Sequence, residues 1–440
     1  MADSLRIGIA GLGTVGASLV RILQQRSNEL AITCGRAIEI IAVSARDRSR
    51  DRGIDLKGIT WFDTPEQLAS EADIDVFVEL VGGASGQAEN AVRAALARGL
   101  HVVTANKALL AKHGVELATI AEDKGALLNF EAAVAGGIPV IKALRESLTG
   151  NHVSRIYGIM NGTCNYILTK MEKEGLSFEA CLKEAQRLGY AEADPAFDIE
   201  GNDTAHKLAI LTTLAFGNKI SADDIYLEGI TNISSEDIQA AAELGYRIKL
   251  LGVAQVTESG IEQRVHPTMV PLDSVIAQVD GVTNAVAIES DILGELLMVG
   301  PGAGGNATAS SVLGDIADIA KSRPGAQQVP VLGHPAKSLE PSRKAQIQSH
   351  EGGYFIRLTV LDRTGVFASV ATRMAENHIS LESIVQRSKQ HLSPSHHQTI
   401  ILVTHATTED SVRKAVEAIK TEGYLVGEPQ VIRIERPKED

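Results

Sequence analysis

Carboxylates crowd just ahead of one lysine in the stretch YAEADPAFDIEGNDTAHKLAIL, and four of them are of interest. They are Glu192, Asp194, Asp198 and Asp203, and the lysine is Lys207. The Gly-Asn-Asp triplet predicts a helix start that puts Asp203 and Lys207 one turn apart on one face. Such a lysine, partly withdrawn from water, could protonate an oxygen that gains negative charge. The alternative is an exposed i,i+4 ion pair, which is common and weak.

A glycine-rich turn, GLGTVG, lies between an expected strand and an expected helix. Gly11 permits a tight turn, and Gly13 lets the backbone approach a pyrophosphate at the helix start, formed by Thr14 and Val15. Gly16 lets the helix and the strand pack closely. The turn therefore predicts a dinucleotide site, the alternative being a glycine-rich turn without a ligand.

The end of the second expected strand, AVSARDRSR, bears on the choice of dinucleotide. Ser44, Arg46 and Arg48 stand where an acidic residue would bind the ribose 2′-hydroxyl of NAD, and Asp47 lies beyond the strand. A 2′-phosphate would meet a cation there. We expect NADP(H) to be preferred, with NAD(H) possible.

Two further motifs could face the same cleft. Lys107 follows the strand HVVT, and a lysine at the carboxyl end of a parallel strand can hold a carboxylate or contact the nicotinamide side. The second glycine-rich turn, GPGAGGNAT, could approach the cofactor through Gly305. The alternatives are a solvated lysine and a plain helix cap.

Cysteine and histidine chemistry is not favoured. Cys164 has no histidine near it in sequence and is expected to be a small buried thiol. His391, His396 and His397 stand in a loop rich in Ser and Pro, which favours a solvated loop over a metal site.

Length, charge and composition set limits on the class of protein. A chain of 440 residues, 44% of them apolar, is expected to form two or three domains. Three scattered cysteines favour a reducing compartment, and the start MADSLRIGIAG and the lack of a long apolar run favour a cytoplasmic protein without a membrane segment. A net charge of −13 argues against nucleic acid as a partner.

The pattern of expected strands and helices divides the chain. Alternating strands and helices predict an α/β N-terminal part, a Rossmann-type doubly wound parallel sheet. An α+β substrate-binding and dimerisation part follows, with one of its helices expected over EDIQAAAELGYRIKLLG, then a Pro- and Ser-rich linker and a compact ferredoxin-like βαββαβ unit. The expected ranges are 1–130, 131–304, 323–352 and 353–437, with a helix over 305–322 packing back on the first part.

Seven motifs in this order resemble homoserine dehydrogenase. They are GLGTVG, ELVGG, TANKALLA, FEAAVAGGIPVI, GIMNGTCNYIL, GYAEADPAFDIEGNDTAHK and GPGAGGNATASSVLGDI. The resemblance spans about residues 5–322, and the tail from Tyr354 resembles an ACT domain. No aspartokinase-like segment precedes the motifs, so the monofunctional form is expected.

This resemblance implies reversible NAD(P)H-dependent reduction of L-aspartate 4-semialdehyde to L-homoserine, in threonine, methionine and isoleucine biosynthesis. Lys207 matches the family's proton donor to the carbonyl oxygen, and Asp203 the carboxylate that orients this lysine. Glu192 matches a ligand of the substrate's amino group, Asp198 an acidic residue close to it, and Lys107 the second lysine of the site.

The resemblance also implies a bound cation and regulation. Glu131, with the backbone carbonyls of Val134, Gly136 and Ile138, matches a site for sodium or potassium that fixes the hinge between domains. The turn Leu361–Val366 matches the effector turn of ACT domains, with L-threonine as the expected inhibitor. A homodimer through the middle part, or a homotetramer through the tails, is expected.

Two rival functions stay open at this point. A phosphorylating semialdehyde dehydrogenase would need a catalytic cysteine. A non-catalytic amino-acid sensor would have the tail as its working part, although the set of Lys207, Asp203 and Glu192 weighs against it.

Overall fold

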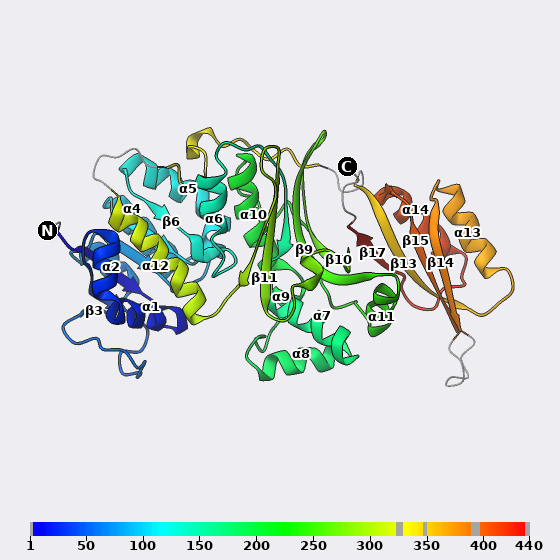
Figure 1. Cartoon of the computed structure of the whole chain (residues 1–440), viewed down its shortest axis with the longest axis horizontal. Helices are drawn as coiled ribbons and strands as arrows, with labels where there is room; N and C mark the ends of the chain where they lie inside the picture. The colour runs from blue at the N-terminus through cyan, green and yellow to red at the C-terminus, as the bar shows by residue number, and fades with distance from the viewer. Residues whose placement is uncertain (1–2, 323–328, 346–349, 389–396, 436–440) are drawn as a thin grey trace.

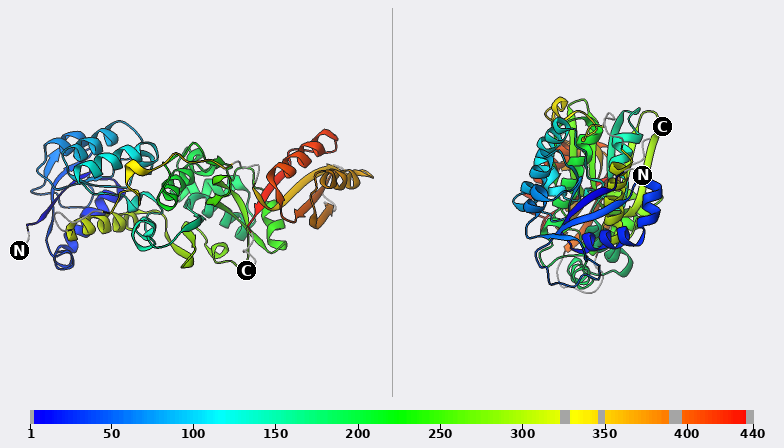
Figure 2. Two further views of the ribbon diagram at one scale, coloured as in Figure 1. Left: turned by 90° about the horizontal axis from the view of Figure 1, so that it is seen from above. Right: turned by 90° about the vertical axis from the view of Figure 1, so that its left-hand side faces the viewer.

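The computed structural model describes residues 3–322, 329–345, 350–388 and 397–435. The molecule is elongated, with the N-terminal part at one end and the C-terminal unit at the other (Figures 1 and 2). Within the described residues, every helix is too short or too polar to cross a lipid bilayer.

The N-terminal part is built on six parallel strands in the order β3-β2-β1-β4-β5-β6. The strands are β1 (Leu5–Ala10), β2 (Ile38–Ser44), β3 (Thr60–Phe62), β4 (Val76–Glu79), β5 (His101–Thr104) and β6 (Leu128–Asn129). The order reverses between β1 and β4, which is where doubly wound sheets bind ligands. The predicted Rossmann-type sheet is confirmed.

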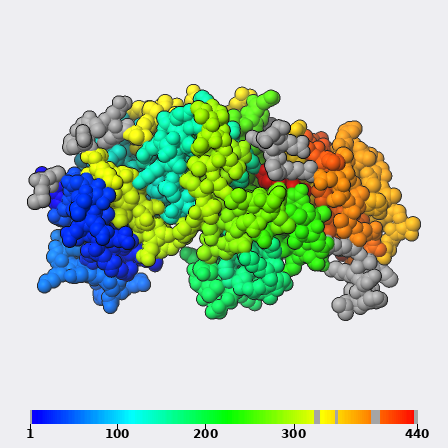
Figure 3. Space-filling model, viewed as in Figure 1, coloured from blue at the N-terminus to red at the C-terminus, as the bar shows by residue number. Residues whose placement is uncertain are grey.

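Helices cover both faces of this sheet. One face packs against α1 (Thr14–Gln25), α2 (Ser27–Cys34) and α12 (Gly305–Lys321), and the other against α3 (Pro65–Glu71), α4 (Gln87–Ala97) and α5 (Lys107–Lys124). The chain thus returns after residue 304 to complete the first face, and Figure 3 shows the yellow residues of α12 beside the blue N-terminal ones.

The middle part is a mostly antiparallel sheet covered on one face by helices. Its five long strands pair antiparallel in the order β12-β11-β7-β9-β10, and the short β8 pairs in parallel with β10. The strands are β7 (Val153–Ile159), β8 (Tyr226–Leu227), β9 (Tyr246–Thr257), β10 (Gly260–Pro271), β11 (Thr283–Ser290) and β12 (Gly294–Pro301). The helices are α7 (Gly162–Glu174), α8 (Phe178–Arg187), α9 (Ala196–Ile199), α10 (Asn202–Phe216) and α11 (Ser235–Glu243). Helix α10 packs on β9 and also on α5, so it joins the middle part to the N-terminal part.

The helix expected over residues 236–252 is wrong in its second half. Helix α11 ends at Glu243, Gly245 takes a left-handed φ of 86°, and β9 begins at Tyr246. Only a residue without Cβ adopts that conformation at little cost, so the helix stops there. The following apolar run pairs with β7 and β10, and this tertiary pairing decides its structure.

The C-terminal unit has the predicted βαββαβ order and its own apolar core. Its elements are β13 (Glu351–Leu361), α13 (Val366–Glu376), β14 (Leu381–Ser388), β15 (His397–Thr404), α14 (Glu409–Thr421) and β17 (Gln430–Ile434), with the short β16 (Thr407–Thr408) paired to the start of β13. Strand β17 pairs in parallel with β10, so the sheets of the middle part and of this unit are continuous. His397 begins β15, while His391 and His396 lie outside the described residues.

The segment for which we predict a linker is partly packed. Leu332, Ala336 and Leu339 are buried, and the amides of Val331 and Ala336 donate to the Glu122 carboxylate of α5 at 3.2 and 2.8 Å. This stretch is therefore a strap fixed to the N-terminal part rather than a free tether.

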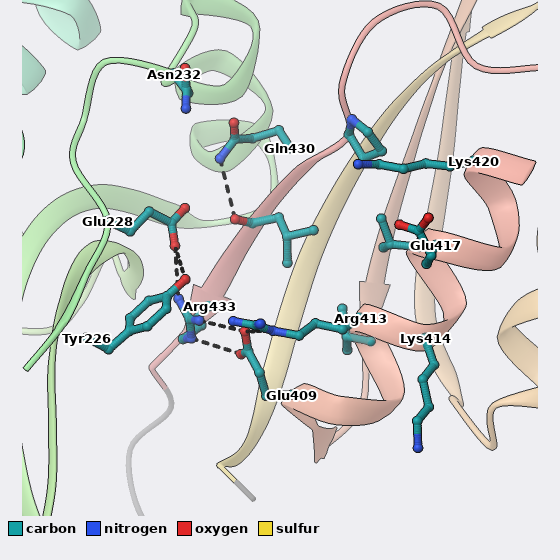
Figure 4. Close-up of a pocket in the computed structure, with 14 residues that line it drawn as sticks. Tyr226, Glu228, Asn232, Glu409, Arg413, Lys414, Glu417, Lys420, Gln430 and Arg433 are labelled. Carbon is teal, nitrogen blue, oxygen red and sulfur yellow. Dashed lines mark hydrogen bonds and ion pairs between the residues drawn. The ribbon is translucent and has the colours of Figure 1, made fainter. Parts of the chain in front are cut away.

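Buried ion pairs fasten the C-terminal unit to the middle part. The Arg433 guanidinium of β17 donates to both carboxylate oxygens of Glu409 at 3.0 and 2.7 Å, and to Glu228 of the middle part at 3.2 Å (Figure 4). Arg357 of β13 pairs with the buried Asp237 of α11 at 2.5 Å. The contact between the two parts is thus both a shared sheet and a set of desolvated charges.

Loss of Arg433 should destabilise the chain far more than loss of its neighbour Arg413. Arg433→Met leaves the Glu409 side chain, 7% exposed, without its main partner, which costs about 3–5 kcal/mol. Arg413 also reaches Glu409, but its side chain is 51% exposed, so Arg413→Met should cost less than about 1 kcal/mol. Urea unfolding followed by circular dichroism measures both, and equal shifts of the midpoint would refute the difference.

Candidate active site

Helix α10 presents Asp203 and Lys207 on one face, as the cap signal predicts. The helix begins at Asn202 after Gly201, which has a φ of 91°. The Lys207 Nζ atom lies 2.7 Å from Asp203 Oδ2, and the two residues are only 9% and 4% exposed. The pair is therefore buried, and the interpretation as an exposed surface pair is wrong.

A second lysine reaches the same carboxylate from the N-terminal part. Lys107, the first residue of α5, places its Nζ 2.9 Å from Asp203 Oδ1, and Lys207 also donates to the Met160 carbonyl at 2.6 Å. Burial alone would raise the pKa of Asp203, but the two ammonium charges hold that pKa well below its usual range. Asp203 is thus a fixed negative charge between two lysines.

A third contact joins Asp203 to Asp198. The Asn161 Nδ2 atom donates to Asp203 Oδ2 and to Asp198 Oδ1, both at 2.8 Å. Burial and the nearby Asp203 raise the pKa of Asp198. The sequence analysis missed Asn161, although an asparagine directly before a helix is a capping signal that could have singled it out.

Glu192 is not brought to this cluster. It is exposed on the loop between α8 and α9, and its carboxylate has no hydrogen bond or ion pair among the residues that the structure describes. Asp194, on the same loop, accepts from the Ala196 amide at 3.2 Å at the start of α9. The assignment of Glu192 to the substrate's amino group stays a prediction.

The first glycine-rich turn has the geometry of a phosphate cradle. Gly11 has a φ of 99°, and its amide donates to the Ser44 carbonyl at 2.8 Å. Gly13 is the N-cap of α1, so that Thr14 and Val15 form the helix's first turn. A Cβ at Gly16 would lie 2.0 Å from the Gly11 carbonyl oxygen. Any side chain there would push the helix off the turn, and amides at such a helix start favour an anion.

The second glycine-rich turn lies against the first. A Cβ on Gly305, the first residue of α12, would stand 2.9 Å from Thr14 Cγ2 and from Ser18 Oγ. The structure therefore brings Gly305 next to the predicted cofactor-binding turn, where a larger residue would have to displace the Thr14 and Ser18 side chains of α1.

Several arginines stand near the end of β2. Ser44 is buried and Arg46 is exposed. Arg52, which the sequence analysis missed, donates from Nε to the Leu12 carbonyl at 3.1 Å and lies with Arg48 about 6 Å from the centre of the Trp61 ring. The pattern RDRSRDR, in which every second residue is an arginine, could have singled out Arg52 together with Arg46 and Arg48.

Glu79, also missed, organises the ends of β4 and β5. Its Oε1 accepts from the Val81 and Gly82 amides at 2.8 Å, and its Oε2 accepts from the Thr104 hydroxyl at 2.5 Å. Asn106 then caps α5 through the Leu109 amide at 3.0 Å, which fixes the start of the helix that carries Lys107. The motif ELVGG, which begins with Glu79 at the end of β4, could have singled out this residue from the sequence.

The residues of the predicted cation site all lie on the short segment that follows β6. Glu131 is buried, which raises the pKa of its carboxyl group, and its two oxygens accept the amides of Ile141 and Lys142 at 2.8 and 3.0 Å. The chain from Val134 to Ile138 is buried or nearly so and turns through Gly136, with a φ of 38°. The described residues hold no cluster of three His, Cys, Asp or Glu side chains fit for a metal. One carboxylate and several carbonyls would suit a hard cation, which prefers oxygen ligands.

Comparison with known proteins follows the same division of the chain. Residues 139–317 match the family model for homoserine dehydrogenase, residues 11–131 that for the homoserine dehydrogenase NAD-binding domain, and residues 354–423 that for the ACT domain. A homoserine dehydrogenase of Pseudomonas aeruginosa is 44% identical over 439 residues, covering 98% of this chain and 99% of that protein. One of Neisseria gonorrhoeae is 42% identical, covering 98% of each.

The chain belongs to the homoserine dehydrogenase family. It is an NAD(P)-dependent oxidoreductase that acts on a CH–OH group, with a C-terminal ACT domain. The crystal structure of a homoserine dehydrogenase from Thiobacillus denitrificans is similar, with a TM-score of 0.92, 41% identity and coverage of 98% of each chain. A hyperthermophilic archaeal homoserine dehydrogenase in complex with NADPH has a TM-score of 0.61 and 28% identity, covering 71% of this chain and 96% of that one.

Cys164 should not act as a nucleophile in this chain. Its thiol is buried, which raises its pKa well above the usual value, and it donates to the Asp198 carbonyl at 3.3 Å. Cys164→Ser should retain turnover within about threefold, whereas loss of a nucleophile costs orders of magnitude. Cys181→Ser, at a second buried thiol in α8, is the control for burying a hydroxyl group. If Cys164→Ser alone abolished turnover, Cys164 would be a nucleophile, and the result would favour a phosphorylating semialdehyde dehydrogenase instead.

Proposed function

We propose that this chain catalyses the reversible reduction of L-aspartate 4-semialdehyde to L-homoserine, with Lys207 as the acid catalyst. The supporting observation is the buried Asp203 carboxylate held between Lys207 and Lys107, one from the middle part and one from the dinucleotide-binding part. Such an arrangement puts two ammonium groups at the junction where an aldehyde and a nicotinamide would meet.

The proposed chemistry follows from the charge that develops during reduction. The reduced nicotinamide, when bound, supplies the hydride. As hydride reaches the carbonyl carbon, the oxygen gains negative charge, and Lys207 donates a proton to it. Asp203 keeps the ammonium group of Lys207 oriented, and the Met160 carbonyl fixes a second direction. In the reverse direction, neutral Lys207 takes the hydroxyl proton.

The substrate's charged ends need partners of opposite sign. Its ammonium group suits the Asp198 carboxylate, and we assign a second contact to Glu192, whose exposed loop would have to approach the cluster. Its carboxylate suits Lys107, which is one-third exposed beside Asp203. Lys107 also stands at the carboxyl end of β5, so it can contact the nicotinamide side as well.

Replacement of Lys207 tests the proposal. Lys207→Met should lower kcat by about two to four orders of magnitude, because the acid catalyst is removed. Lys170→Met is the matched control, since Lys170 forms an exposed i,i+4 pair with Glu174 on α7, and its kcat should be unchanged. The assay follows NADPH absorbance at 340 nm with aspartate 4-semialdehyde. Unchanged turnover in Lys207→Met would refute the assignment.

We propose that NADP(H) is the preferred cofactor and that NAD(H) also binds. The support is the pair of cations, Arg46 and Arg48, that follow Ser44 at the end of β2, together with the similarity to an archaeal relative in complex with NADPH. Arg46→Ala should raise KM for NADPH at least about tenfold with little effect on KM for NADH, because a charge-assisted contact to the 2′-phosphate is lost. Lys57→Ala, an exposed cation on the same loop, should change neither constant. A wild-type KM for NADPH above that for NADH would contradict the preference.

We propose feedback inhibition by L-threonine through the ACT domain, as expected of an enzyme in threonine, methionine and isoleucine biosynthesis. The turn after β13 is exposed from Asp362 to Gly365, with Gly365 at a φ of 92°. Millimolar threonine should inhibit the wild type, and Asp362→Ala should weaken inhibition without changing basal turnover. Asp410→Ala, at an exposed carboxylate of α14, should leave inhibition intact. An enzyme indifferent to threonine would refute this part of the proposal.

We further propose a cytoplasmic homodimer or homotetramer that binds sodium or potassium at Glu131, Val134, Gly136 and Ile138. The exposed apolar side chains of the middle part, such as Val275 and Val299, suit an interface between copies. A monomer by light scattering would contradict the assembly. Activity that is the same in sodium, potassium and a large organic cation would contradict the cation site.

A further inference from the structure

The side-chain amide of Asn161 is shared between two carboxylates. We infer that Asn161 is a positioning residue that fastens Asp198 to Asp203 and thereby keeps Asp198 available as an anion for the substrate's ammonium group. The inference rests on the proposed function. Neither the motifs of the sequence nor the family resemblance assigned a role to this residue.

The orientation of the amide is fixed by three hydrogen bonds. Asn161 Oδ1 accepts from the Cys164 amide at 2.8 Å as the N-cap of α7, and both hydrogens of Nδ2 are used, one on Asp198 Oδ1 and one on Asp203 Oδ2. A flipped amide would place its oxygen against two carboxylates and leave the helix start uncapped. The side chain is only 5% exposed, so water cannot readily replace it.

Residues beside Asn161 hold the other members of the cluster. Asn161 follows β7 in the middle of the sheet, and the preceding carbonyl, of Met160, accepts from Lys207 Nζ at 2.6 Å. The Cys164 thiol, one turn into α7, donates to the Asp198 carbonyl. One strand-to-helix junction therefore positions the lysine and both carboxylates relative to each other.

The charges that face Asp198 explain why such a donor is needed. Burial and the negative charge of Asp203 both favour the protonated form of Asp198, and thus raise its pKa. The Asn161 hydrogen bond, Lys207 of α10 and Lys107 of α5 act in the opposite direction. Asn161 is the neutral member of this set, so its removal shifts the balance without altering the net charge of the site.

Asn161→Ser distinguishes the two roles of Asn161, which are the bridge between the Asp198 and Asp203 carboxylates and the cap of α7. A serine can still cap α7, as Ser177 and Ser234 cap α8 and α11 in this chain, but it cannot donate to both carboxylates. The pKa of Asp198 should then rise, so Asp198 becomes protonated at a higher pH than in the wild type. We expect the acid limb of kcat/KM for homoserine oxidation to move up by about one pH unit. KM for homoserine near neutral pH should rise roughly tenfold, and KM for NADP should stay within about twofold.

Two further variants complete the test. Asn161→Asp keeps the cap and adds a third carboxylate, so the acid limb of its pH profile should move up by more than that of Asn161→Ser. If the serine variant does not fold, Asn161→Asp alone provides the test. Ser177→Ala removes the cap of the neighbouring α8. It should lower the melting temperature but leave the pH profile unchanged, which separates loss of a helix cap from loss of the bridge.

A measurement without turnover separates this inference from the proposed function. Carboxyl ¹³C NMR titration, with Asp198→Asn to assign the resonance, should give a higher Asp198 pKa in Asn161→Ser than in the wild type. If the wild type lacks the reaction with either cofactor, the proposed function fails and the titration still decides the role of Asn161. An unchanged Asp198 pKa, or an active Asn161→Ser with the wild-type pH profile, would overturn the inference.

Discussion

The burial of the Asp203 carboxylate between two ammonium groups is the interaction on which the rest of the site depends. A buried carboxylate is costly unless it is paired and hydrogen-bonded, and Asp203 receives Lys207, Lys107 and Asn161. Lys107 comes from the dinucleotide-binding part and Lys207 from the middle part. The negative charge of Asp203 is therefore fully paired only when the two parts are docked. A hinge opening that withdrew Lys107 would leave Asp203 with one cation instead of two.

The backbone connects this cluster to the ACT domain without a break. Strand β17 pairs with β10, β10 pairs with β8, and the Ile230 amide, just after β8, donates to the Ile199 carbonyl at 2.9 Å. Ile199 is the neighbour of Asp198. Glu228, between β8 and Ile230, is the residue that Arg433 of β17 contacts. A displacement of the ACT domain would thus act on a short, hydrogen-bonded segment that ends beside a carboxylate of the site.

Local signals in the sequence were sufficient where a single element sets the geometry. The glycine spacing of the first turn and the cap before Lys207 predicted α1 and the Asp203–Lys207 pair, since both depend on one helix start. Contacts between distant segments were not predictable in this way. The contacts of Lys107 and Asn161 with Asp203 depend on helix α10 lying against segments that follow two separate strands, and the contact of Glu79 with Thr104 depends on β4 lying beside β5. The continuity of β17 with β10 depends on pairing across more than one hundred and fifty residues. The helix expected beyond Gly245 failed for the same reason, because a strand partner outweighed local periodicity.

The most direct test of this account is a double-mutant cycle on Asp203 and Lys207. Rapid-mixing kinetics would give the rate of NADPH oxidation for Asp203→Asn, Lys207→Met and the double variant, with NADPH fluorescence to verify that each still binds the cofactor. If the two residues act as one buried unit, the double variant loses no more rate than the worse single variant. Losses that multiply would mean that Asp203 and Lys207 act independently, and would contradict the central claim.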